Sequence, residues 1–405
     1  MNRKKPNVVP LRDLLDETPR NGYSPVCPEL PTGKWVLGLS ALNGRGLDLS
    51  AAKPAPEGDP LVDKFMLRPG DFLISRSNTV NRVGHVGVFR GGLENCSYPD
   101  LMMRFRPDIQ KVDPHYLETY LRSDAVILFI RQHATGTSGS MKKISREIVE
   151  LIPIVVPVVE EQEAIATVLL EWDAAIEGTE QLIAAKWLSV KELMRRLFRE
   201  HAYPRRQLAA FSSPVTRKNT HGGGHPLTIS GADGLVSQSR YFDKRIAAEK
   251  TDHYTLLKRG EFAYNRSYSA GYPLGAIKRL DTHDEGVVST LYLCFALIEG
   301  EAPLSNYFAY FCESGGFNHQ IYQVAQEGAR NHGLLNVTAE DFFSMSMPVP
   351  PPDVQLRVVR VLDAAHEELR LLREQLVAVK MQKRGLMQKL LTGEWRLPLR
   401  QEEAV

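Results

Sequence analysis

The stretch PVVEEQEAIATVLLEWDAAIE at residues 157–177 has the pattern of the start of a long amphipathic helix. A counterpart, PPPDVQLRVVRVLDAAHEELR, follows at residues 350–370, which is 193 positions later (350 − 157). In both stretches, prolines end an apolar run, a glutamine stands five residues after the first proline, and apolar residues then recur at helical spacing. The sequence therefore predicts the same helix start twice.

Other blocks recur in the same order before each helix start, about 190 residues apart (226 − 36 = 190). An interval of this length indicates a duplicated domain rather than a solenoid, whose repeats are much shorter. The paired blocks are VLGLSALNG (36–44) with PLTISGADG (226–234), LRPGDFLISRSN (67–78) with LKRGEFAYNRSY (257–268), and YLETYLRS (116–123) with YFAYFCES (307–314).

The first part of each half predicts a mixed domain. Short apolar runs bounded by Gly, Pro or Asn predict strands at 72–75, 86–89, 262–265 and 291–297. Residues 114–132 have helical spacing, with Pro114 placed as the opening residue. Because strands and helices do not alternate regularly, we expect the α+β class. The predicted boundaries are 1–158 and 203–350 for the two domains, 159–202 and 351–398 for the helices, and 399–405 for a tail.

The second part of each half predicts a long helix with apolar residues at a 3-4 spacing, which is typical of a coiled coil. Two such stripes in one chain can bury each other, and a pseudo-twofold relation between the halves makes the pair antiparallel. The alternative is that each helix packs on its own domain or on another protein. The predicted pairing residues are Ile165, Leu169, Trp172, Ile176, Ile183, Val190, Leu197, Val358, Leu362, Leu369, Leu372, Leu376, Val379, Leu386 and Leu390.

The composition is that of an ordinary globular protein, with 43% hydrophobic and 24% charged residues among 405. No apolar run approaches the 18 or so residues of a membrane span, and the basic N-terminus lacks a secretory signal, so we expect a cytoplasmic protein without membrane contact. The four cysteines form no CxxC pair, which argues against a zinc site. A net charge of +2 does not by itself indicate a nucleic-acid partner.

Motifs of an enzyme are missing. We find no GxGxxG after a strand and no P-loop, and the histidines of HGGGH (221–225) are more typical of a flexible loop than of a metal site. We therefore expect a non-catalytic chain that holds no metal or cofactor.

The repeated helix segments resemble those of the specificity subunits of type I restriction–modification systems. The resemblance rests on IPIVVPVVEEQEAIATVLLEWDAAIE (152–177), ELMRRLF (192–198), MPVPPPDVQLRVVRVLDAAHEE (347–368) and GLMQKLLTGEWRLP (385–398). It implies two target recognition domains that each read half of a bipartite, asymmetric site on double-stranded DNA. It also implies helices that act as a spacer and bind two methyltransferase subunits, with restriction/translocase subunits joining them. S-adenosylmethionine, ATP and Mg²⁺ would belong to those partner subunits.

Polar loops beside predicted strands are the candidate DNA contacts, since Arg suits guanine, Asn suits adenine, and Lys suits phosphate. Each loop also has a simpler interpretation, as a strand-end arginine paired with a carboxylate or as a solvated turn. The predicted DNA-binding residues are Arg76, Ser77, Asn78, Asn81, Arg82, Ser140, Lys142, Lys143, Arg217, Lys218, Arg240, Asn265, Arg266, Ser267, Tyr268, Arg330 and Asn331.

A scaffold that binds protein rather than DNA would use the same coiled coil, and it remains the alternative function. Salt-sensitive DNA binding distinguishes the two, because only a DNA reader releases counterions from phosphates. The sequence gives neither the bases read, nor the spacer length, nor the methylated base, nor whether the system still restricts.

Overall fold

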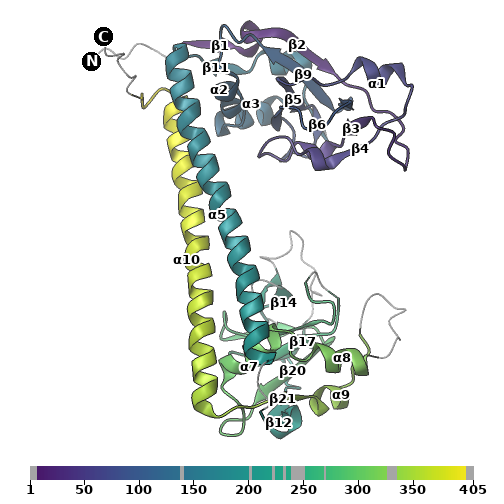
Figure 1. Cartoon of the computed structure of the whole chain (residues 1–405), viewed down its shortest axis with the longest axis vertical. Helices are drawn as coiled ribbons and strands as arrows, with labels where there is room; N and C mark the ends of the chain where they lie inside the picture. Colours follow the sequence, from purple (N-terminus) through teal and green to yellow (C-terminus); the bar gives the residue numbers. More distant parts are fainter. Residues whose placement is uncertain are drawn as a thin grey trace. The chain divides into compact units, whose positions relative to one another are not determined.

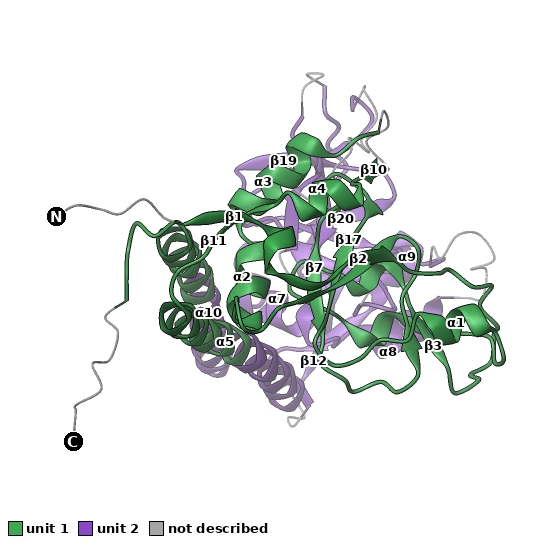
Figure 2. Ribbon diagram, turned by 90° about the horizontal axis from the view of Figure 1, so that it is seen from above, with its two compact units in different colours: residues 1–179, 375–405 green, residues 180–374 purple. Residues whose placement is uncertain are grey.

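The computed structural model describes residues 7–136, 141–199, 203–220, 224–230, 234–238, 251–268, 271–325 and 335–397. It divides into two compact units (Figure 2), residues 1–179 with 375–405 (unit 1) and residues 180–374 (unit 2). Each unit contains one mixed domain and half of each long helix. The division therefore cuts through both helices, and the predicted domain boundaries stay predictions.

Unit 1 contains the purple and blue elements of Figure 1. They are β1 (Val8–Pro10), η1 (Leu11–Leu14), β2 (Leu15–Asn21), β3 (Trp35–Leu37), η2 (Leu39–Ala41), η3 (Leu49–Ala51), β4 (Ala52–Pro54), α1 (Pro60–Lys64), β5 (Asp71–Ser75), β6 (Ser77–Asn78), β7 (Val86–Phe89), β8 (Cys96–Ser97), β9 (Met102–Pro107), α2 (Pro114–Leu121), α3 (Asp124–His133), β10 (Lys142–Lys143), α4 (Arg146–Glu150) and β11 (Pro153–Val155). Helix α5 (Val159–Arg199) begins in this unit.

Unit 2 repeats this plan with fewer described elements. They are β12 (Arg205–Gln207), η4 (Leu208–Ala210), β13 (Ser212–Pro214), β14 (Leu227–Ser230), β15 (Gly234–Ser237), β16 (Thr255–Lys258), β17 (Phe262–Asn265), β18 (Ala276–Arg279), β19 (Glu285–Val288), β20 (Tyr292–Leu297), α7 (Ser305–Glu313), α8 (Asn318–Val324), α9 (Ala339–Ser344) and β21 (Ser346–Pro348). Helix α10 (Pro352–Leu391) begins here and ends in unit 1.

The same antiparallel sheet forms the centre of both domains. Its strand order is β2-β9-β5-β7 in unit 1 and β13-β20-β17-β18 in unit 2. Phe72 lies opposite Phe105 in the first sheet, and Phe262 lies opposite Phe295 in the second. The α+β class, the predicted strands and the duplication are confirmed.

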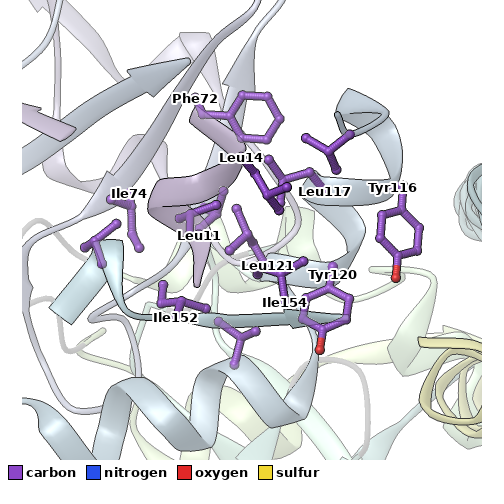
Figure 3. Close-up of a cluster of buried hydrophobic side chains, with 14 of the residues drawn as sticks. Leu11, Leu14, Phe72, Ile74, Tyr116, Leu117, Tyr120, Leu121, Ile152 and Ile154 are labelled. Atoms are coloured by element: carbon purple, nitrogen blue, oxygen red, sulfur yellow. The ribbon is translucent and has the colours of Figure 1, made fainter. Parts of the chain in front are cut away.

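A hydrophobic core joins each sheet to its helices. In unit 1, Phe72 and Ile74 of β5 pack with side chains of η1, α2 and β11, as Figure 3 shows. Tyr116 is fully buried there and its hydroxyl donates to Val155 O at 2.8 Å. Burying side chains of this size stabilises the fold by about 1.5–3 kcal/mol each, so this core fixes the sheet against the strand that leads into α5.

Each long helix leaves its domain in the same way. Strand β1 pairs antiparallel with β11, which is followed after three residues by α5. Strand β12 pairs antiparallel with β21, which is followed after three residues by α10. The matching helix starts of the sequence therefore follow equivalent edge strands.

The helices pair antiparallel within each unit. In unit 1, Asp173 Oδ1 lies 2.5 Å from Lys383 Nζ, and Glu161 near the start of α5 lies 3.2 Å from Arg396, just beyond the end of α10. In unit 2, Lys186 Nζ lies 2.7 Å from Glu368 Oε1. Lys383 and Lys186 thus each form an ion pair with the opposite helix.

The predicted pairing residues all lie buried or half-buried. Those in the core of unit 1 are Ile165, Leu169, Leu386 and Leu390. Those that cluster between the helices in unit 2 are Ile183, Val190, Leu197, Val358, Leu362 and Leu369. Those half-buried along the remaining length are Trp172, Ile176, Leu372, Leu376 and Val379.

The predicted helix over 114–132 is wrong in one respect, because it is two helices. It breaks between Leu121 and Asp124, where the Ser123 side chain accepts from Val126 N and caps α3. Gly393 follows the end of α10 with a φ of 70°, as expected of a C-terminal glycine. Within the ranges given above, no helix has the length and apolar content to cross a membrane.

Candidate nucleic-acid interface

The repeated LRPGD and LKRGE turns are held by their acidic residues. Asp71 is fully buried, and its carboxylate accepts from Arg68 N at 2.7 Å, Arg104 Nη1 at 2.9 Å and Arg106 Nε at 2.7 Å. The equivalent Glu261 accepts from Lys258 N at 2.8 Å. Charge-assisted bonds of this kind are the strong ones, so the acid of the motif holds the turn rather than contacting DNA.

Glu261 also occupies one predicted DNA contact. Arg217 Nη2 lies 2.9 Å from Glu261 Oε1, and Arg217 Nη1 donates to Leu256 O at 3.0 Å. The neighbouring Lys218 donates to His253 O at 3.2 Å. Both side chains therefore have partners within unit 2.

The predicted loop 75–82 divides into a buried and an exposed part. Ser77 and Asn78 are buried in β6, and Asn78 Oδ1 accepts from Thr79 N at 2.9 Å. Arg76 is half-buried, and its Nη1 faces Asp100 O at 3.4 Å. Asn81 and Arg82 are exposed in the turn that follows. Of the predicted DNA-binding residues in this segment, these two have exposed side chains.

The arginine of the second loop has the same backbone role. Arg266 Nε donates to Leu291 O, and its Nη1 donates to Val337 O, both at 3.1 Å. Asp100 and Leu291 lie one or two residues before equivalent strands, β9 and β20. The shared arginine thus anchors the loop to backbone carbonyls, instead of the carboxylate that the sequence suggested as the simpler interpretation.

The structure brings together loops that are far apart in the sequence. Strand β6 pairs with β10, so that Asn78 lies opposite Lys142 and Ser77 opposite Lys143. Ile144 N also donates to Arg76 O at 3.0 Å. Unit 2 has the equivalent bond, Leu335 N to Arg266 O, at 2.9 Å. In both units, the backbone at the predicted arginine is therefore bonded to a second segment that lies far away in the sequence.

In unit 1, cationic side chains lie on these segments and at the end of α3. We call these four residues, Arg82, Arg131, Lys142 and Lys143, the basic edge. Lys142 Nζ donates to Gly136 O at 2.6 Å, and β10 is tied to the segment after α3 by Thr135 and Lys143, which exchange backbone bonds of 2.9 Å. None of the four forms an ion pair with a described residue, so their positive charges are available to an anion.

Arg131 was missed by sequence reasoning. It lies exposed in the last turn of α3, and only the fold brings both it and Arg82 close to His85. Burial lowers the pKa of His85, and the nearby charges of Arg82 and Arg131 lower that pKa further. A second missed group lines a hollow of about 520 Å³ whose cationic residues are Arg20, Lys64, Arg68 and Arg104. These residues come from separate segments, so no local pattern reveals them.

Two aromatic side chains are exposed in the described part of unit 2. Tyr268 of the predicted loop is 67% exposed, and Tyr322 of α8 is 72% exposed. Asn265 Oδ1 accepts from Ser267 N at 3.0 Å, which shapes the turn before Tyr268. The predicted contacts Ser140, Arg240, Arg330 and Asn331 lie outside the described residues.

Comparisons with known proteins agree with this architecture. No protein-family model matches the chain. A curated relative from Methanocaldococcus jannaschii, described as the MjaX type I restriction enzyme specificity subunit, is 21% identical over 96% of this chain and 93% of its own length.

Two solved structures are similar over nearly the whole chain. A chain from a structure of a type I restriction–modification system, described in terms of complex assembly and conformational transition, aligns with a TM-score of 0.56 at 13% identity, covering 96% of this chain and 98% of its own. A type I restriction–modification S subunit from M. genitalium aligns with a TM-score of 0.49 at 12% identity, covering 96% and 97%. The curated relative is thus described as a specificity subunit and not as a catalytic subunit. In sequence the chain is thus similar to a type I restriction–modification specificity subunit, and its fold is similar to that of a chain from such a system, in line with the family that its repeated helix starts resemble.

Proposed function

We propose that this chain is the DNA-reading subunit of a type I restriction–modification complex and recognises an asymmetric, bipartite site. The observation that carries the proposal is the duplication. Two domains built on the same sheet each continue into a long helix through the same start. Two readers on one chain match a site with two specific parts.

The described candidate residues of the two units differ in chemistry, which supports two different half-sites. The basic edge of unit 1 suits phosphates and guanine, since lysine and arginine contact both. Tyr268 and Tyr322 of unit 2 offer flat apolar faces and hydroxyl groups. A symmetric pair of readers would instead favour a palindrome, because the symmetry of a site mirrors that of its reader.

The paired helices suit the role of a spacer. Helix α5 has 41 residues and α10 has 40, so each is about 60 Å long at about 1.5 Å per residue. One turn of B-DNA rises about 34 Å. Readers set apart by such a helix pair would leave a stretch of unread bases between the half-sites.

The outer faces of the helices suit partner subunits. Large apolar side chains stay exposed there, although they take no part in the seam, and a contiguous apolar surface often marks a protein interface. They are Leu182, Leu188, Val361, Leu371, Val377 and Met381. We propose that two methyltransferase subunits bind these faces, that restriction/translocase subunits join them, and that the partners hold S-adenosylmethionine, ATP and Mg²⁺. The complex would act in the cytoplasm, where the DNA is.

The test is to purify the chain with its methyltransferase and to measure DNA affinity as salt rises. A specificity subunit predicts that log K falls linearly with log salt, at about 0.9 per phosphate contacted. A protein-binding scaffold predicts no salt-sensitive DNA binding, and that result would reject the proposal.

A further inference from the structure

Two glutamines occupy the same position in the two helix starts. Gln162 is 0% exposed and Gln355 is 4% exposed. A buried amide costs free energy unless its donors and acceptors are satisfied. Both glutamines satisfy them, and with equivalent groups.

Gln162 connects α5 to α2. Its Oε1 accepts from Asp113 N at 2.8 Å, and its Nε2 donates to Pro157 O at 2.9 Å. Asp113 is the N-cap of α2, and Pro157 lies two residues before α5. One side chain therefore joins the starts of two helices.

Gln355 makes the same connection in unit 2. Its Oε1 accepts from Leu304 N at 2.8 Å, and its Nε2 donates to Pro350 O at 2.8 Å. Leu304 is the N-cap of α7, which corresponds to α2. Because the glutamine bonds to backbone groups in both units, the connection does not depend on whether the capping residue is an aspartate or a leucine.

These hydrogen bonds make the contact between each long helix and its domain directional, whereas the rest of that contact is apolar. Ile165 and Leu169 of α5 pack into the core of unit 1, and Val358 and Val359 of α10 pack into that of unit 2. Hydrophobic contact is non-directional and tolerates small rotations of a helix. A hydrogen bond weakens steeply as its angle is lost, so two bonds from one amide restrict the helix to one orientation on its domain.

We propose that Gln162 and Gln355 are positioning residues that set how each recognition domain is held on its helix, and through this the number of unread bases between the half-sites. The inference rests on the proposed function, since spacing has meaning only for a bipartite DNA site. Each glutamine acts within its own unit. Replacing either one alone is therefore sufficient to relax the spacing.

The test uses the full chain expressed with its methyltransferase in cells that lack other methylation. Gln162→Leu and Gln355→Leu each remove both bonds, and sequencing of methylated DNA then gives half-sites and spacing. We expect methylation of sites whose spacer is one base longer or shorter to rise about tenfold relative to the original chain, which is about 1.4 kcal/mol of lost discrimination. Both half-site sequences should stay unchanged.

Two further variants make the result decisive. Gln382→Leu changes an exposed glutamine of α10 and should leave the spacing as it is. Gln162→Glu keeps an acceptor for Asp113 N but loses the donor to Pro157 O. If the leucine variants do not accumulate in cells, the spacing measured for Gln162→Glu provides the test instead. Unchanged spacing in active variants, or altered half-site bases, would overturn the inference. In that case, a bipartite motif for the original chain would still support the proposed function. The absence of any motif for the original chain would reject the proposed function and the inference together.

Discussion

Replacing Asp71 with alanine should destabilise unit 1 far more than the equivalent change destabilises unit 2. Asp71 is fully buried, and its partners Arg104 and Arg106 have side chains only 14% and 26% exposed. Removing Asp71 leaves Glu17, whose side chain is 35% exposed, as the remaining carboxylate partner of both arginines. We therefore expect a loss of about 3 kcal/mol, the lower end of the range for breaking a buried ion pair.

The matched change in unit 2 is Glu261→Ala. Its partner Arg217 is 39% exposed, so water can replace much of the lost contact. We expect a loss of about 1 kcal/mol, near the upper limit for exposed pairs. Asp13→Ala is the control, because Asp13 and its partner Arg12 are both 56% exposed, and it should change the free energy of unfolding by less than about 0.5 kcal/mol.

Urea unfolding measures the size of these losses, and hydrogen exchange assigns them to a unit. For Asp71→Ala, the amides of β5, β7 and β9 should lose protection while those of β17, β18 and β20 keep it. If Asp71→Ala costs no more than Asp13→Ala, the buried carboxylate does not hold the LRPGD turn, and the structural assignment of this motif is wrong.

Three other results follow from the site and the helices. Replacing Arg82 and Lys143 together with alanine should weaken binding to all DNA sequences and lower the salt slope by about 2, as expected for two phosphate contacts; Arg12→Ala is the control, and a loss confined to one target base would instead make them base readers. Burial lowers the pKa of His366, which packs against Trp187 and Tyr310 and whose buried Nε2 has no hydrogen-bond partner among the described residues. Its folded pKa thus lies below the unfolded value of about 6.5, so the stability it supports is complete above that pH and is lost as pH falls. Urea unfolding at pH 7 and pH 5 should show that the free energy of unfolding falls less between these pH values for His366→Leu than for the original chain. An unchanged fall would assign the pH dependence to other groups. Exchanging residues 1–158 for another recognition domain should change one half-site in the methylated motif, and a change in both would reject two independent readers.

Much of the architecture can be predicted from the sequence because its periodic signals are strong. The 3-4 spacing indicates two long helices, and the repeated PVVEEQ and PPPDVQ starts locate the first residues of α5 and α10. The break at Ser123 could not be predicted in the same way, since the apolar spacing continues through it. Only the serine cap, a weak local signal, ends one helix and starts the next.

The candidate interface was less predictable because it depends on contacts between distant segments. Arg76 and Arg266 are of a residue type that often reads bases, yet their guanidinium groups face backbone carbonyls of other segments. Arg131 has no motif around it and gains its place from the fold. Whether a side chain can contact DNA depends on its contacts within the protein, and a sequence pattern does not show those contacts.

Sequencing of methylated DNA from cells with and without this chain, in the presence of its methyltransferase, tests the central claim most directly. The account predicts one motif made of two different half-sites with a fixed number of unread bases between them, present only when the chain is expressed. A palindromic motif, or the same methylation without the chain, would contradict it.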